Sequence, residues 1–277
     1  MHNSQPGSRV WRWIALVAVL INIFFNYYLN ANPIGGQTIG DVSGKYPTLI
    51  TPAGYAFSIW GVIYLTFIIY AIAQVLPSRR NNQVYNHLAK PLIATSVLSI
   101  GWLISFSMEY ICVSVLIITG MLLTAILLFG RSKTATFQHQ ASLWITIPFG
   151  LYVAWLSVAT VVNISVWLTD MGWHVGITGG TLWTVIMIGV VLALAIIISY
   201  IFRDLSYPLV VLWATFAIYV AQKNENELVA TAALFTGILL AIWVAGYGIW
   251  LYNNSGRSIS GKHNYVTGDS AWSYRNR

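Results

Sequence analysis

Long apolar runs with almost no charge dominate this sequence and decide its fold class. Of 277 residues, 57% are hydrophobic and 8% are charged, whereas soluble domains carry about 25% charged residues. Several runs reach the roughly 20 residues that an α-helix needs to cross about 30 Å of hydrocarbon. Backbone groups in lipid must pair within the spanning segment. The sequence therefore predicts an all-α, multi-pass transmembrane helical bundle whose first partner is the lipid bilayer.

The runs divide into about eight predicted spans. They lie at residues 10–29, 52–76, 91–108, 110–130, 143–169, 181–202, 206–222 and 228–252. Only a tight turn around Glu109 separates the third span from the fourth. We therefore expect these two spans to form an antiparallel hairpin.

The basic residues give the predicted orientation. With eight spans, twelve Lys and Arg side chains fall on the side of both termini, and only Lys45 and Lys223 fall on the other. The positive-inside rule then predicts cytoplasmic termini, in a plasma or inner membrane. Arg9 and Arg12 before an apolar run are also typical of a signal peptide. The run is long for that role, and no convincing cleavage site follows, so we expect a retained first helix.

Several function classes find no support in the sequence. The net charge of +7 is spread over loops and tails, which argues against a nucleic-acid partner. The single cysteine, Cys112, excludes a disulfide framework within one chain. No paired carboxylate, phosphate loop or H-E-x-x-H motif is present, so we expect neither an enzyme nor a metal site. All five histidines fall in predicted loops or tails, which argues against a haem-iron protein: His2, His87, His139, His174 and His263.

Aromatic rings cluster at the start of the second span. Phe57, Trp60 and Tyr64 are spaced i, i+3, i+7 and so share one helix face. Lipid does not require such a face, so the rings indicate either a flat apolar ligand or a tightly packed neighbouring helix. Tyr55 lies close enough to the membrane edge to belong to an interfacial belt. The Gly- and Pro-rich loop 30–51 precedes these rings. It either folds over that end of the bundle as a lid or is a plain connector.

A second stripe lies on the fifth span. Tyr152, Trp155, Ala159 and Asn163 recur at spacings of three or four, and Trp102 on the third span adds another ring away from the bundle ends. An amide as deep as Asn163 is costly in lipid unless it is hydrogen-bonded. Asn163 is therefore either an interhelical bridge or a polar contact for a ligand.

These motifs resemble the TspO/MBR family of tryptophan-rich sensory proteins, which are related to the translocator protein. The second helix of that family begins with a proline and aromatics followed by Trp-x-x-x-Tyr, and its fifth has a proline and then Trp-x-x-x-Ala-x-x-x-Asn. The matching residues here are Pro52, Phe57, Trp60, Tyr64, Trp102, Pro148, Trp155, Ala159 and Asn163. A family tryptophan six residues before Trp60 is replaced by Gly54.

The similarity covers residues 10–169, the first five spans, so the chain resembles an extended member. It implies a TspO-like five-helix core at 1–175, three added helices at 176–252 and a polar cytoplasmic tail at 253–277. It also implies a receptor, sensor or carrier for porphyrins or related tetrapyrroles, or sterols, in a pocket of the core, with no covalent cofactor. The added helices cap the core, mediate homo-oligomer contacts or form a second module.

The predicted ligand-binding residues are Tyr55, Phe57, Trp60, Tyr64, Trp102, Tyr152, Trp155, Ala159 and Asn163. Three alternatives stay open at this point. The added spans could complete the path of a small-molecule transporter or permease. The aromatic stripes could serve only as packing surfaces of a membrane assembly factor without a ligand. The third alternative is an enzyme that modifies porphyrins.

Overall fold

The computed structural model describes residues 7–172 and 177–260. Within these residues all regular structure is helical. The long helices are α1 (Gly7–Ala31), α3 (Ile59–Ala73), α4 (Val84–Ser107), α5 (Ile111–Phe137), α6 (Ile147–Asp170), α7 (Ile177–Phe202), α8 (Ser206–Gln222) and α9 (Glu227–Ser260). The short helices are η1 (Ile34–Gly36), α2 (Ile39–Lys45), η2 (Gly54–Ser58), η3 (Pro77–Arg79) and η4 (Leu143–Thr146).

Length and composition make this an integral membrane protein. Seven of the described helical segments are long and apolar enough to cross a bilayer, and Ser206–Gln222 is a shorter apolar helix. Each predicted span corresponds to one of these segments. The prediction of an all-α, multi-pass bundle is therefore confirmed.

Some helix ends differ from the predicted ones. α4 begins at Val84 and runs through Pro91, where the sequence placed the start of the span. α5 continues to Phe137, well past residue 130. The predicted ends mark where the apolar residues stop. The helices continue past them, because backbone hydrogen bonds within a helix do not depend on apolar side chains. α9 likewise extends to Ser260, past the predicted end of the last span at residue 252.

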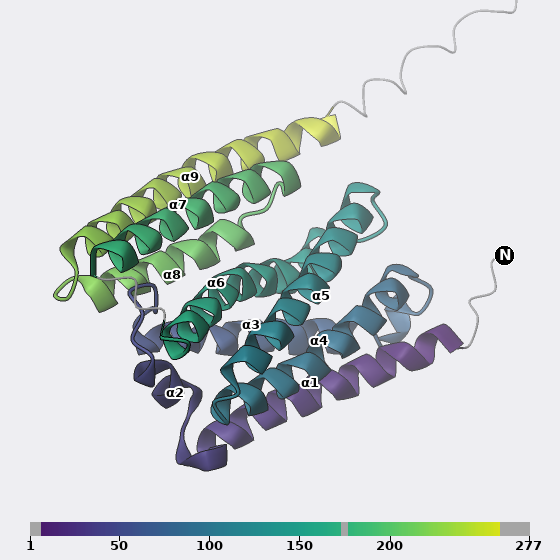
Figure 1. The fold of residues 1–277 in the computed structure, drawn as a ribbon. Coiled ribbons are helices and arrows are strands. Elements are labelled where there is room, and N and C mark those ends of the chain that lie inside the picture. The colour runs from purple at the N-terminus through teal and green to yellow at the C-terminus, as the bar shows by residue number, and fades with distance from the viewer. Residues whose placement is uncertain (1–6, 173–176, 261–277) are drawn as a thin grey trace, which may run out of the picture.

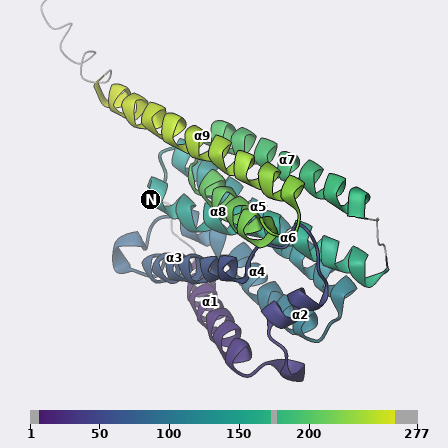
Figure 2. The ribbon, with the colours of Figure 1, turned by 90° about the vertical axis from the view of Figure 1, so that its left-hand side faces the viewer.

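The first five long helices form one bundle, and α7–α9 stack on one side of it (Figure 1). α4 and α5 form the expected hairpin, with Glu109 in the left-handed region at φ 60° in the turn between them. α1 packs on α3 and α4 at the side away from α9, and α8 joins the added helices to α6 (Figure 2).

One large apolar cluster includes buried residues of both parts. Buried rings from the first helices, such as Phe67, Phe149 and Trp155, belong to the same cluster as Val211 of α8 and Leu240 of α9. Gly150 of α6 permits the close approach, because a Cβ there would collide with the Ser206 side chain of α8. The added helices thus share the core of the first five. The division at residues 175 and 252 stays a prediction.

Candidate functional site

A short helical segment covers one end of the bundle. α2 lies in the loop that precedes the aromatic cluster, and a capping box fixes its start. The Thr38 backbone N–H donates to Asp41 Oδ2 at 2.8 Å, and the Asp41 N–H donates to Thr38 Oγ1 at 3.2 Å. The Thr38 hydroxyl also donates to Asp41 Oδ2 at 2.7 Å, and this bond, together with the one from the Thr38 N–H, lowers the pKa of the Asp41 carboxyl. We call residues 37–46, centred on α2, the lid segment.

The lid segment is tied to the α4–α5 turn by one carboxylate. Lys45 Nζ lies 2.6 Å from Glu109 Oε1, and the Tyr46 hydroxyl donates to Glu109 Oε2 at 3.1 Å. The bond from Lys45 lowers the pKa of Glu109 below its ordinary value of 4.5. Partial desolvation, together with this carboxylate, raises the pKa of Tyr46 to about 12. Both partners of the ion pair are partly exposed, and we call this contact the latch.

An apolar cavity lies beneath the lid segment. Its volume is about 30 Å³, which holds about one water molecule. Residues from the lid segment, η2, α3, α4 and α6 line it. They are Ile39, Ser43, Pro52, Phe57, Trp60, Trp102, Phe106, Trp155, Val158, Ala159, Val162 and Asn163.

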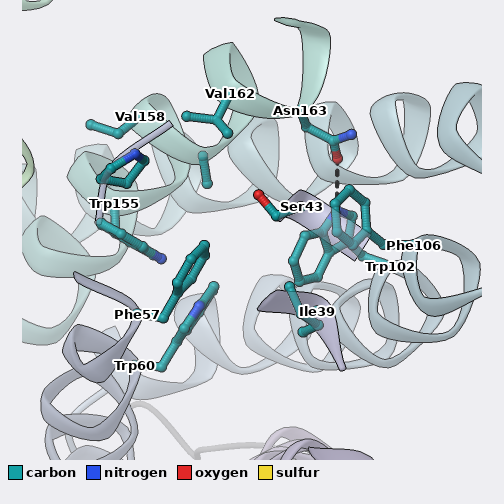
Figure 3. A pocket seen from close by; sticks show the side chains of 12 residues that line it. Ile39, Ser43, Phe57, Trp60, Trp102, Phe106, Trp155, Val158, Val162 and Asn163 are labelled. Atoms are coloured by element: carbon teal, nitrogen blue, oxygen red, sulfur yellow. Dashed lines mark hydrogen bonds between the residues drawn. The ribbon is translucent and has the colours of Figure 1, made fainter. Parts of the chain in front are cut away.

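Five aromatic rings line this cavity (Figure 3). The Trp155 ring lies edge-on to two others, with centroid distances of 6.2 Å to Phe57 and 6.3 Å to Trp60. Trp102 and Phe106 stack at 5.4 Å. Edge-to-face and stacked pairs of this kind are each worth about 0.5–1.5 kcal/mol beyond the area that they bury. The rings therefore hold one another in place around the cavity.

Some polar groups in the cavity wall have hydrogen-bond partners, and others have none. Asn163 Oδ1 accepts from Trp102 Nε1 at 2.9 Å, and Asn163 Nδ2 donates to Ser114 Oγ at 3.0 Å. Asn163 is thus an interhelical bridge between α4, α5 and α6. The indole N–H of Trp155 and the Ser43 hydroxyl are buried without a hydrogen-bond partner in the described structure. These two groups are the ones that a bound molecule could satisfy.

Six of the nine predicted ligand-binding residues line the cavity. They are Phe57, Trp60, Trp102, Trp155, Ala159 and Asn163. Tyr55, Tyr64 and Tyr152 do not line it.

The three tyrosines that do not line the cavity contact other parts of the protein. Tyr55 points away to α8, where its ring lies edge-on to Trp213 at 5.3 Å. Tyr64 stacks on Trp60 at 5.4 Å, one turn deeper than the cavity. Tyr152 shares a hydrogen bond of 2.8 Å with Thr95 and belongs to the core. Helical spacing placed Phe57, Trp60 and Tyr64 on one face, but the cavity reaches only the part of that face next to the lid segment.

The other six lining residues were not predicted from the sequence, and only some of them could have been. Phe106 lies one turn beyond Trp102, and Val158 and Val162 flank the recognised stripe on α6, so helical spacing could have added these three. Ile39 and Ser43 come from the loop, and no periodicity places a loop residue over a distant helix. Pro52 was identified only as a helix start.

The lining carries no acid or base. It contains no histidine, cysteine, aspartate or glutamate. The described residues hold no group of three such side chains that could bind a metal ion. His87 lines a different cavity, and His139 lies just past α5. His2, His174 and His263 lie outside the described residues. The cavity can therefore hold a ligand by shape, stacking and two hydrogen bonds.

Weakening the latch should expose the lid segment. An exposed ion pair contributes about 0.2–1 kcal/mol, so Glu109→Gln should raise the rate of tryptic cleavage after Lys45 by up to about fivefold. Because the folded pKa of Glu109 is lowered, the latch is complete above pH 4.5 and is lost as pH falls through that lowered pKa. Mass spectrometry of the peptides measures the cleavage at neutral pH.

Glu225→Gln is the matched control, because it removes an exposed carboxylate from a different loop. Cleavage after Lys45 should be unchanged in this variant. Equal cleavage rates in wild type and Glu109→Gln would show that Glu109 does not hold the lid segment.

Comparison with known proteins places this architecture in a family. Neither the curated proteins nor the solved structures gave a match. A family model described as TSPO-like protein matches residues 12–246. The match confirms the resemblance seen in the aromatic motifs and continues past the first five spans, through α7 and α8 into α9. Since it covers far more than half of the sequence, the chain belongs to the TSPO-like protein family.

Proposed function

We propose that this protein binds a flat, largely apolar ligand of the tetrapyrrole or sterol class in the aromatic cavity and acts as a receptor, sensor or carrier for it. The observation that carries the proposal is a cavity walled by Phe57, Trp60, Trp102 and Trp155 that also presents an unpaired indole N–H. Membership of the TSPO-like family supports the same assignment.

The wall chemistry suits such a ligand. Aromatic rings stack on a planar conjugated system and also pack against a rigid sterol. The Trp155 N–H can donate to a carboxylate, carbonyl or hydroxyl oxygen of the ligand, and the Ser43 hydroxyl can donate or accept. A buried donor without a partner costs about 1–3 kcal/mol, and a ligand acceptor would remove that cost. The absence of an ionisable group from the lining favours binding over chemistry at the ligand.

The cavity is small in this conformation. A volume of about 30 Å³ is far below the roughly 300–1,000 Å³ of small-molecule sites. Ligand entry therefore requires the lid segment to move, because Ile39 and Ser43 occupy one side of the cavity. The latch at Glu109 sets how often this happens, and closure afterwards would remove water from the ligand. The proposal thus couples binding to a movement of a surface segment, which is what a sensor needs.

The test of this function is binding stoichiometry with protoporphyrin IX. Purified protein should bind it saturably at one molecule per chain, should release it chemically unchanged, and should not move it across proteoliposomes against a gradient. Net flux would instead support a transporter, and repeated turnover would support an enzyme. A folded sample with no saturable binding would contradict the proposal and favour an assembly factor.

A further inference from the structure

A second cavity lies at the opposite end of α3 from the aromatic one. Its volume is about 240 Å³, and its lining includes Arg9, Arg12, Trp13, Gln74, Pro77 and Arg80. These residues come from the start of α1 and from the loop that follows α3. The aromatic cavity lies at the first turns of α3, so the helix length separates the two. This cavity belongs to the membrane edge that carries most of the basic residues.

Among the described residues, no acid forms an ion pair with Arg12 or Arg80 of this cavity. Arg12 is buried and donates to the backbone carbonyls of Gln74 at 3.2 Å, Arg79 at 3.0 Å and Asn82 at 2.7 Å. Carbonyl dipoles satisfy its hydrogen bonds but leave its full charge in place. The two ion pairs found between described residues involve lysines, and neither includes Arg12, Arg79 or Arg80. Arg12 and Arg80 therefore place two positive charges at this cavity.

The surroundings of the cavity match the headgroup layer of a bilayer. Trp13 is 56% exposed beside it, and an exposed tryptophan at a span end is typical of the membrane–water interface. Arg80 and Pro77 are also exposed, so the cavity opens to its surroundings. Gln74 is fully buried in its wall, and its Oε1 atom lacks a hydrogen-bond partner within the described part of the chain. The cavity thus combines arginine donors with one unused acceptor.

We propose that this cavity binds the headgroup of an anionic phospholipid. Arg80 would take the phosphate, because a guanidinium group donates to phosphate oxygens in a planar, two-point geometry, and the charge of the buried Arg12 would add to the attraction. Basic pockets at the edges of transmembrane helices are suited to this role. Gln74 Oε1 would accept from a headgroup hydroxyl, so a glycerol headgroup fits better than choline. Choline offers no hydroxyl and places a cation near the arginines.

The experiment uses the full chain in nanodiscs of phosphatidylcholine with increasing phosphatidylglycerol. Native mass spectrometry counts the lipids that remain bound to the protein after it is released from the nanodisc. Wild type should retain phosphatidylglycerol in preference to phosphatidylcholine. Arg80→Gln should lower the retained phosphatidylglycerol about fivefold, the effect expected for one basic residue near an anionic surface. Arg80→Lys should restore part of it. Arg80 is exposed, so neither change should unfold the protein, which circular dichroism checks.

Arg131→Gln is the matched control. It removes the same charge from an exposed residue outside this cavity, where Arg131 donates to the His87 carbonyl. An equal loss in this control would show general surface attraction and overturn the proposal. A second arm adds inorganic phosphate to the protein in detergent. If phosphate stabilises the protein against unfolding in detergent and the nanodiscs show no preference for phosphatidylglycerol, the cavity binds a soluble anion. That result would overturn the lipid assignment.

Discussion

Lys133→Met is expected to destabilise the protein by about 3–5 kcal/mol, because it leaves a buried carboxylate without its counter-charge. Lys133 Nζ lies 2.6 Å from Asp204 Oδ2, and the two side chains are only 3% and 6% exposed. Detergent-titrated unfolding, followed by circular dichroism, measures the change. The pair joins the end of α5 to the turn between α7 and α8, so its loss should loosen the added helices first.

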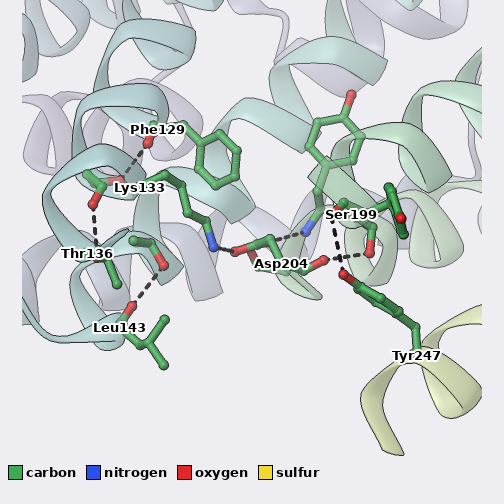
Figure 4. Close-up of polar contacts among 12 residues, drawn as sticks. Phe129, Lys133, Thr136, Leu143, Ser199, Asp204 and Tyr247 are labelled. Atoms are coloured by element: carbon green, nitrogen blue, oxygen red, sulfur yellow. Dashed lines mark hydrogen bonds and ion pairs between the residues drawn. The ribbon is translucent and has the colours of Figure 1, made fainter. Parts of the chain in front are cut away.

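The carboxylate of Asp204 has further partners that fix its position (Figure 4). It accepts from the Tyr207 backbone N–H at 3.1 Å and from the Ser206 hydroxyl. The Asp204 carbonyl accepts from Ser199 Oγ at 2.7 Å, and Trp243 Nε1 of α9 donates to that hydroxyl at 3.2 Å. Through these bonds one ion pair connects α5 with α7, α8 and α9.

The control for this prediction is Lys45→Met. Lys45 and Glu109 are also 2.6 Å apart, but their side chains are 46% and 32% exposed, so the loss should stay below about 1 kcal/mol. The double variant Lys133→Met with Asp204→Asn should be more stable than Lys133→Met alone, because no unpaired charge remains buried. Additive losses in the double variant would contradict the account of the pair.

Trp155→Ala carries the second large effect, a destabilisation of about 3–5 kcal/mol. The Trp155 side chain is 1% exposed and lies at the centre of the ring cluster with Phe57 and Trp60. Removal of the indole leaves a void that the neighbouring rings, fixed by their own contacts, cannot fill. Trp155→Phe should cost much less, because it keeps a ring and removes the unpaired N–H. The same unfolding titration measures both variants.

Trp183→Ala serves as the control for this variant. Trp183 of α7 is 40% exposed, so its truncation removes few packing contacts and should change stability by less than about 1 kcal/mol. A Trp155→Ala loss as small as that of Trp183→Ala would mean that the aromatic cluster is not a packed wall.

The fold could be predicted from the sequence because lipid imposes simple rules. Apolar length gave every span, and the short turn at Glu109 gave the α4–α5 hairpin. The sequence did not reveal that α5 continues to Phe137 and thereby carries Lys133 to Asp204. That contact joins residues 71 positions apart in the chain, and no local pattern encodes such a pairing.

The lining of the cavity could be predicted where helical spacing determines it. Trp155, Ala159 and Asn163 line the cavity because they share one face of α6. Tyr55 lies in the 3-10 helix η2 and does not line the cavity, because its ring packs against Trp213 of α8. The lid residues Ile39 and Ser43 depend on how a loop folds back, which is a tertiary property. Asn163 was left open between two roles; its bonds to Trp102 and Ser114 make it an interhelical bridge, and its contact with a ligand stays a prediction.

The most direct test of the aromatic cavity is a titration of wild type, Trp60→Leu and Trp183→Leu with protoporphyrin IX. Porphyrin absorbance should be the readout, since it does not depend on the number of tryptophans. Trp60 is only partly buried, so its replacement should leave the protein folded. We expect saturable binding by wild type, about tenfold weaker binding by Trp60→Leu from the lost stacking and area, and unchanged binding by Trp183→Leu. Equal affinities for folded wild type and Trp60→Leu, or no saturable binding at all, would contradict the proposed ligand site.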